Sequence, residues 1–200
     1  VNNLLVRGNK NHLKIGWVTT WNTRCGIATY SKHILDNFSE DVVIFAPRDK
    51  EIEKEDNFKV YRCWDIGSFN LDELILQIKI NLINTVVIQF NYGFFDFKAF
   101  SDFLNKLIEN GINIILTLHS TFDPLNDSEK SLSILSPILK KIDRILVHSV
   151  KDINRLKLLN LVDNVTLFPH GILNYKFLKR TQYKPLFNKR NQNFDYHISS

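Results

Sequence analysis

The segment Thr85-Val86-Val87-Ile88-Gln89-Phe90 carries apolar, mostly β-branched residues on consecutive positions. A strand with one face in water would alternate apolar and polar residues, so this run predicts a strand that is covered on both faces. Six other short runs have a similar character. They are residues 14–19, 41–46, 59–64, 112–118, 144–147 and 165–168. Strands of this kind are typical of parallel sheets in α/β proteins.

Helical periodicity fills most of the segments between these runs. Apolar residues recur there at steps of three and four, which places them on one face of a helix. The five sets are Ile27/Tyr30/Ile34/Phe38, Leu71/Leu74/Ile75/Ile78, Phe97/Phe100/Leu104/Ile108, Leu132/Leu135/Leu139/Ile142 and Ile153/Leu156/Leu159. Alternating strands and helices predict parallel pairing through right-handed crossovers. We therefore expect an α/β fold with an open, doubly wound, mainly parallel sheet of about seven strands.

Length and composition fit one globular domain. The chain has 200 residues, of which 44% are hydrophobic and 24% are charged. No apolar run approaches the roughly 18 residues of a membrane-spanning helix, and the polar start lacks the apolar core of a signal peptide. Cys25 and Cys63 are too few for a disulfide framework or a zinc site. These features favour a cytoplasmic protein with reduced thiols.

The net charge of +5 is concentrated near the end of the sequence. Of the 26 lysines and arginines, six lie between Asn174 and Arg190, and the other 20 are matched by 21 acidic residues. We therefore expect a domain over residues 1–173 and a basic tail, linker or truncated edge over residues 174–200. A solvated linker is the favoured interpretation of this tail. Contact with phosphate groups at the inner face of a membrane stays open, whereas the near-neutral body argues against nucleic acid.

Ligands bind open parallel sheets beyond the carboxyl ends of the strands, and the first such loop here is Thr20-Trp21-Asn22-Thr23-Arg24-Cys25. A helix that starts near Gly26 would direct free N–H groups and its positive dipole end at an anion. The loop matches neither the G-x-G-x-x-G fingerprint nor a Walker motif. A glycine that only allows a tight turn is therefore at least as good an interpretation.

The loop after residues 85–90 is Asn91-Tyr92-Gly93. Its amide and phenol groups suit a polyhydroxylated ligand, which offers both hydroxyls and C–H surfaces. Phe94 and Phe95 follow, and we expect both of them in the core or at an interface.

A histidine follows each of three predicted strands within two residues. His119 follows residues 112–118, where it would donate a hydrogen bond or act as an acid or base near neutral pH. A structural histidine that only satisfies a backbone carbonyl is the alternative. His148 is expected to support or pack, Ser149 to cap the next helix, and residues 169–171 to form a shaped turn that points His170 at a ligand or a neighbouring domain.

Taken in order, these loops resemble the amino-terminal domain of group 1 (family 4) glycosyltransferases of GT-B architecture. The matching segments are residues 14–35, 89–93, 117–120, 147–149 and 168–172. The resemblance implies two Rossmann-like domains that face a cleft, the first receiving the acceptor and the second holding a nucleotide-sugar donor. It also implies sugar transfer with retention, without a metal or another cofactor.

The resemblance further implies roles for individual residues. His119 corresponds to a catalytic histidine near the donor sugar, where it would orient hydroxyls and stabilise charge as the glycosidic bond breaks. The expected contacts of the donor phosphates are Gly26 and Cys25. The residues expected to shape the acceptor pocket are Thr20, Trp21, Asn91 and Tyr92. The turn that enters the interdomain region contains His170 and Gly171.

The sequence departs from the family after Leu173, where only 27 residues follow and none is glutamate. The family's donor domain carries a basic pair and an E-x7-E signature, so we expect most of the donor site to be missing. The expected function is the acceptor-side half of a retaining glycosyltransferase, with little activity alone. Its partners would be a nucleotide-sugar, an acceptor glycan or lipid-linked sugar, and a second Rossmann-like domain. The truncation of a longer protein, a split enzyme and a lone module are three explanations, and a non-catalytic glycan- or partner-binding module is the alternative function.

Overall fold

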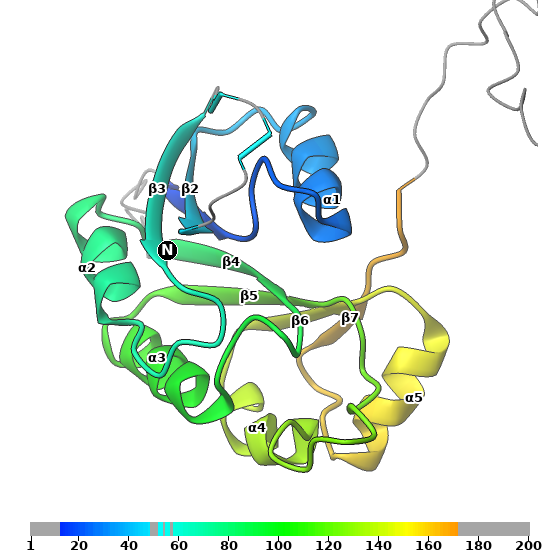
Figure 1. Ribbon diagram of the computed structural model, residues 1–200. Coiled ribbons are helices and arrows are strands. Elements are labelled where there is room, and N and C mark those ends of the chain that lie inside the picture. Colours follow the sequence, from blue (N-terminus) through cyan, green and yellow to red (C-terminus); the bar gives the residue numbers. More distant parts are fainter. Residues whose placement is uncertain (1–12, 49–51, 54, 57, 172–200) are drawn as a thin grey trace, which may run out of the picture. The chain divides into compact units, whose positions relative to one another are not determined.

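The computed structural model describes residues 13–48, 52–53, 55–56 and 58–171 (Figure 1). The chain divides into two units, Val1–Pro169 and His170–Ser200, and the second is described only at His170 and Gly171. The predicted tail over residues 174–200 thus lies outside the described residues.

The described residues of the first unit form one sheet of seven parallel strands and five helices. The strands are β1 (Ile15–Val18), β2 (Val42–Pro47), β3 (Lys59–Trp64), β4 (Thr85–Phe90), β5 (Asn113–Leu118), β6 (Arg144–Val147) and β7 (Val165–Leu167). The helices are α1 (Gly26–Leu35), α2 (Asp72–Ile80), α3 (Phe97–Glu109), α4 (Leu132–Leu139) and α5 (Val150–Leu158). The predicted α/β class and the open parallel sheet are confirmed.

The sheet is doubly wound. Its strand order is β3-β2-β1-β4-β5-β6-β7, so the chain runs outward from β1 in one direction and from β4 in the other. Ile15 of β1 pairs with Val42 of β2 on one side and with Thr85 of β4 on the other. The boundary between β1 and β4 is the topological switch point, where open α/β sheets bind their ligands.

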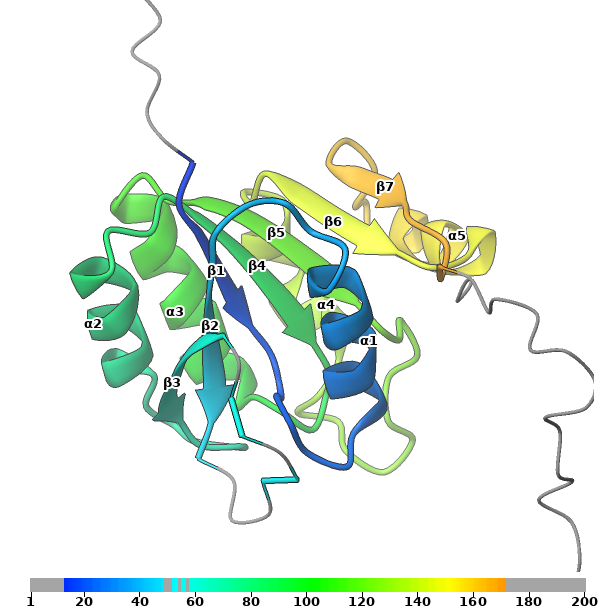
Figure 2. The same cartoon turned by 90° about the horizontal axis from the view of Figure 1, so that it is seen from above.

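The two faces of the sheet are covered unequally. In the described part of the chain, α1 lies by itself on one face, and α2 to α5 cover the other (Figures 1 and 2). The inequality follows from the connection between β2 and β3, whose described residues contain no helix. This connection agrees with the charge-rich, aperiodic sequence of residues 48–57, which cannot offer an apolar helix face.

Side chains alternate between the two faces of the sheet along each strand, and this alternation divides the core into two sides. On β4, Val87 belongs to the apolar cluster beneath α1, whereas Val86 and Ile88 belong to the larger cluster beneath the other helices. Because residues two apart on a strand share a face, Gln89 lies on the α1 side with Val87. By the same rule, Thr117 on β5 shares that side with Ile115. Two buried polar residues thus lie on the α1 side near the carboxyl ends of the central strands.

Gly16 allows β1 to pack closely beneath the larger cluster. A Cβ at this position would lie 2.7 Å from Cε2 of Phe45 and 3.1 Å from Cγ2 of Ile83. The ring of Phe45 is fully buried and stacks on Tyr61 at a centroid distance of 6.1 Å. A side chain at Gly16 would therefore have to displace a fixed aromatic ring.

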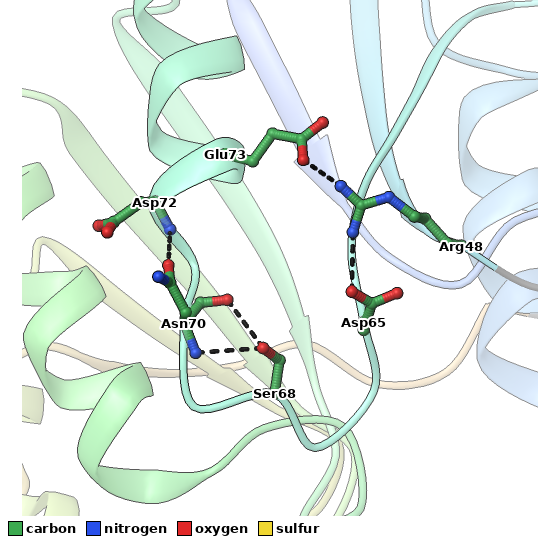
Figure 3. A network of polar contacts seen from close by, with 6 residues as sticks. All are labelled: Arg48, Asp65, Ser68, Asn70, Asp72 and Glu73. Atoms are coloured by element: carbon green, nitrogen blue, oxygen red, sulfur yellow. Dashed lines mark hydrogen bonds and ion pairs between the residues drawn. The ribbon is translucent and has the colours of Figure 1, made fainter.

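An ion network joins the loops at the β2–β3 edge of the sheet. Arg48 follows β2, and its Nη1 donates to Oδ2 of Asp65 at 2.7 Å while its Nη2 contacts Glu73 of α2 (Figure 3). Glu73 lies in the first turn of α2, and its carboxylate points to Arg48. Asn70 Oδ1 accepts a hydrogen bond of 2.7 Å from the Asp72 N–H, just inside the start of α2.

Candidate functional site

The amino terminus of α1 follows the loop after β1, as the sequence predicts. The helix begins at Gly26, and Cys25 before it has an extended backbone and makes no capping hydrogen bond with its side chain. Gly26 is exposed, and a Cβ built there would meet no atom within 4 Å. Open space therefore adjoins the positive end of this helix.

Thr20 and Trp21 support the first loop from inside. Thr20 is 3% exposed, and its hydroxyl donates to the Cys25 sulfur at 3.3 Å. Trp21 is fully buried in the cluster beneath α1, where its ring meets Phe58 edge-on at 5.4 Å. Both residues were expected to shape an acceptor pocket, but these side chains face protein. An apolar indole gains more from burial in a core than from a loop surface, and sequence position alone does not reveal which occurs.

Asn91 and Tyr92 hold the loop after β4. The Asn91 Oδ1 accepts a hydrogen bond from the Gly93 N–H at 2.9 Å, which closes a local turn. Tyr92 is 6% exposed and packs against Phe90 and Phe97. Asn91 thus remains the one predicted acceptor contact with a partly exposed side chain. The expectation that Phe94 and Phe95 belong to the core is confirmed.

His119 lies at the carboxyl end of β5 and bonds to the neighbouring strand. Its Nε2 is 2.8 Å from Oε1 of Gln89, and Gln89 is itself 1% exposed. A carbonyl oxygen only accepts, so Nε2 carries the proton in this contact and the neutral ring holds its lone pair on Nδ1. Nε2 of Gln89 donates in turn to the Thr117 hydroxyl at 3.5 Å. The buried amide therefore fixes both the orientation and the tautomer of His119.

Two other rings contact His119. Tyr30 of α1 meets it edge-on, with centroids 5.0 Å apart and planes at 89°. The ring of His148 lies 5.1 Å from that of His119 and 5.5 Å from that of Tyr30. The loops after β5 and β6 and the second turn of α1 thus meet at one point. We call Tyr30, His119 and His148 the ring cluster.

His148 is fixed from the side of β7. Its Nδ1 is 2.9 Å from the carbonyl oxygen of Phe168, so Nδ1 carries the proton in this contact. The two histidines therefore hold opposite tautomers when neutral. Ser149 caps α5 as the sequence predicts, since its Oγ accepts from the Asp152 N–H at 3.3 Å.

Two carboxylates near this edge have pKa values below the ordinary range. At Asp152, burial favours the neutral acid, but hydrogen bonds from Ser149 and Thr121 and the charge of His148 outweigh it and lower the pKa. At Asp123, burial is again outweighed, here by the Leu132 N–H and the hydroxyls of neighbouring residues, so the pKa is lowered. Burial raises the pKa of the Tyr30 phenol, so this ring is neutral near pH 7.

The two remaining predicted positions, His170 and Gly171, belong to the second unit, and both residues are exposed. Within the described residues, no three side chains of His, Cys, Asp or Glu gather as a metal site. None of the helices in that part of the chain is long and apolar enough to cross a membrane.

A cavity of about 470 Å³ lies at the opposite, amino-terminal end of the strands, between Lys14, Asp41 and Ile83 among others.

Sequence reasoning did not select Gln89, Tyr30 or Asp152. The signal for Gln89 was present, because a polar residue two positions after Val87 in an apolar strand marks a place where a buried amide needs a partner. Tyr30 counted only as one member of an apolar helix face. For Asp152, the capping position of Ser149 indicated one of its two hydrogen-bond partners. The other partner, Thr121, is distant in the sequence.

Comparisons with known proteins leave the family open. No family model matches the chain, and no curated protein matches it. The chain is similar to the crystal structure of the spore cortex-lytic enzyme SleL of Bacillus megaterium QM B1551, with 8% sequence identity and a TM-score of 0.35. That alignment covers 78% of this chain and 49% of the SleL chain, so this chain spans about half the length of that enzyme. A TM-score of this size assigns neither a family nor an activity.

Proposed function

We propose that this domain is the acceptor-side half of a retaining glycosyltransferase of GT-B type. In this proposal a second Rossmann-like domain, on a further segment or another chain, grips the nucleotide part of a nucleotide-sugar. The domain described here supplies the residues that face the diphosphate and the transferred sugar. The support is physical, and comes from the position of a few groups at the switch point of the sheet.

The observation that carries the proposal is the contact between α1 and His119. Tyr30, one turn into the helix that begins at Gly26, touches the ring of His119, whose Nε2 bonds to Gln89. An open helix terminus and an oriented imidazole are thereby held on one rigid frame. A sugar diphosphate needs both features, since its phosphates favour a helix amino terminus and its sugar hydroxyls require directed hydrogen bonds.

The proposed mechanism assigns each group one task. Backbone N–H groups of the first turn of α1, beginning at Gly26, stabilise the diphosphate, which gains negative charge as the bond to the anomeric carbon breaks. The Cys25 N–H already donates to the Thr23 carbonyl oxygen at 2.8 Å, so Cys25 borders the diphosphate without that donor. His119 orients a sugar hydroxyl and stabilises the developing charge. The acceptor hydroxyl forms the new bond on the face that the diphosphate leaves, and its proton passes to the departing phosphate oxygen. Asn91, at the end of β4, borders the acceptor.

Ligand titration monitored by NMR tests the proposal with the full chain. UDP-glucose and GDP-mannose, added separately up to about 5 mM so that weak ligands also bind, should shift the amide signals of Gly26 and Ile27 and the imidazole signals of His119. Glucose alone and UMP serve as controls and should shift them less. If neither nucleotide-sugar moves these signals, the proposed donor contact is wrong.

The alternative function gives a different result in the same titration. A non-catalytic glycan-binding module would respond to oligosaccharides and would be indifferent to the nucleotide diphosphate. In a completed two-domain enzyme, His119→Ala should reduce turnover while the domain stays folded. Unchanged turnover would remove His119 from the reaction.

A further inference from the structure

We propose that Asp152 on α5 is a positioning residue that holds the loops of His119 and His148 in one arrangement. Asp152 lies outside the set of residues that we expect to touch a substrate. Its importance for sugar transfer rests on the proposed function, but its effect on the two histidines does not. The proposal is carried by the hydrogen bonds of one carboxylate to both loops.

The two oxygens of Asp152 serve different loops. Oδ1 accepts a hydrogen bond of 2.7 Å from the hydroxyl of Thr121, which lies two residues after His119. Oδ2 accepts one of 2.6 Å from the hydroxyl of Ser149, which directly follows His148. Thr121 is 3% exposed, so its hydroxyl has little access to water as a substitute partner. The carboxylate thus ties the exits of β5 and β6 to the first turn of α5.

A second side chain of α5 strengthens the same attachment. Arg155, one turn after Asp152, donates from Nε to the carbonyl oxygen of Thr121 at 3.1 Å. Its guanidinium also lies 3.7 Å from the centre of the Phe122 ring. The backbone and side chains of residues 121–122 are therefore held to α5 at several points. A guanidinium over an aromatic ring is a favourable contact at a partly exposed site.

The chemistry of residue 152 matters because two hydroxyls need acceptors at once. An ionised carboxylate accepts from both, whereas an asparagine has a single acceptor oxygen and an NH2 group that only donates. Charge-assisted hydrogen bonds are also stronger than neutral ones. Without the carboxylate, the Thr121 hydroxyl would lose its partner in a buried site, and the segment after His119 would move away from α5.

Loss of the hydrogen bond between Asp152 and Thr121 would also affect the ring cluster. The imidazoles of His119 and His148 are 5.1 Å apart, and each forms a hydrogen bond to a different strand region. A displacement of residues 120–121 would turn His119 away from Gln89. His119 would then lose its single tautomer, although the sheet itself would stay intact.

Long-range 15N–1H NMR of the histidine side chains tests this in the full chain. In the wild-type protein near pH 8, His119 should show the pattern of a neutral Nε2–H ring and His148 that of a neutral Nδ1–H ring. Thr121→Val removes one hydroxyl at nearly constant volume and keeps the Asp152 charge. It should replace the His119 pattern with the average of two tautomers, and the Nε2–H proton signal should be lost. Asp152→Asn should do the same and also disturb His148.

Asp96→Asn is the matched control, because Asp96 is likewise a hydrogen-bonded carboxylate at the start of a helix, where it accepts from the Ala99 N–H at 2.8 Å. It should leave both histidine patterns unchanged. Thr121→Ser keeps the hydroxyl and should retain the wild-type pattern, which preserves the test if the valine variant does not fold. Unchanged histidine patterns in Asp152→Asn, or an equal loss in Asp96→Asn, would overturn the proposal. Neither result involves a nucleotide-sugar, so the positioning role and the proposed function fail independently.

Discussion

The phenol of Tyr92 donates a hydrogen bond of 2.9 Å to Oδ1 of Asp123. The same carboxylate accepts from the Ser131 hydroxyl at 2.8 Å and from the Leu132 N–H at 3.0 Å. The loop after β4 and the start of α4 therefore share one acceptor. Asp123 thus connects two segments that are about 40 residues apart in the sequence at their furthest points, residues 92 and 132.

Tyr92→Phe removes one of these three hydrogen bonds and keeps the buried ring. Because the acceptor is charged but exposed, we expect the free energy of unfolding to fall by about 1 kcal/mol. Urea unfolding at pH 7, followed by circular dichroism, measures this. Tyr61→Phe on β3 is the control, and it should change the value by less than about 0.5 kcal/mol. Equal effects of the two substitutions would show that the Asp123 bond contributes nothing.

Acid should destabilise the domain through Asp123 and Asp152. Both carboxyl groups have lowered pKa values in the folded state. Their stabilising contribution is therefore complete above the ordinary aspartate pKa of about 4 and is lost as the pH falls through the folded pKa values. Unfolding free energies measured from pH 7 to pH 2.5 should be level at first and decline below about pH 4.

The double variant Asp123→Asn/Asp152→Asn provides the control for that profile. It should be less stable than the wild type at pH 7 but should lose less stability on acidification, because two of the titrating groups are gone. A parallel decline in both proteins would assign acid sensitivity to other carboxylates.

The two cysteines should differ in reactivity towards iodoacetamide. Cys63 is 2% exposed, and burial, assisted by the charge of Glu73, raises the pKa of its thiol to about 12. The thiolate is the reactive form, so Cys63 should be protected at pH 8 until the protein unfolds. Cys25 is partly exposed at the start of α1 and should be modified in the native protein. Peptide mass spectrometry gives the order, and modification of Cys63 first would contradict the burial argument.

Two glycines form a matched pair for substitution by alanine. At Gly16 the new methyl group would lie 2.7 Å from the buried Phe45 ring, so Gly16→Ala should lower the unfolding free energy by about 1–3 kcal/mol. At Gly26 the methyl group meets nothing, and Gly26→Ala should stay within about 0.5 kcal/mol of the wild type. Thermal unfolding compares them. Under the proposed function, Gly26→Ala should nevertheless reduce the NMR signal shifts that UDP-glucose causes in the titration.

The fold was accessible from the sequence because the central strands β1 and β4 are buried on both faces. Three predicted strands, β3, β4 and β6, have the observed bounds, and Ser149 caps α5 as expected. Gly111, two residues after the end of α3, adopts a φ of +66°, a backbone conformation that a glycine accommodates without strain. Local signals of this type depend on a few neighbouring residues and need no knowledge of the tertiary structure.

The candidate site was less accessible, because side-chain direction at strand ends depends on partners far along the chain. The placement of His119 at the end of β5 followed from the sequence, but its bond to Gln89 depends on the register between β4 and β5. The first-loop aromatic Trp21 is buried against Phe58, a neighbour from a segment without a periodic pattern. Such pairings are set by tertiary packing, which no single stretch of sequence encodes.

Among the described helices, α1 alone covers its face of the sheet, and this has a kinetic consequence. The helix is joined to the sheet partly through a buried contact of 2.8 Å between the hydroxyls of Ser31 and Thr19, while α3 on the opposite face packs against both α2 and α4. A fluctuation that lifts this one element would let water reach Tyr30 and the imidazoles without melting the remainder. Amide hydrogens of α1 should therefore exchange with deuterium sooner than those of α3. The access of water to this edge of the sheet would then depend on how often α1 detaches and how long it stays detached.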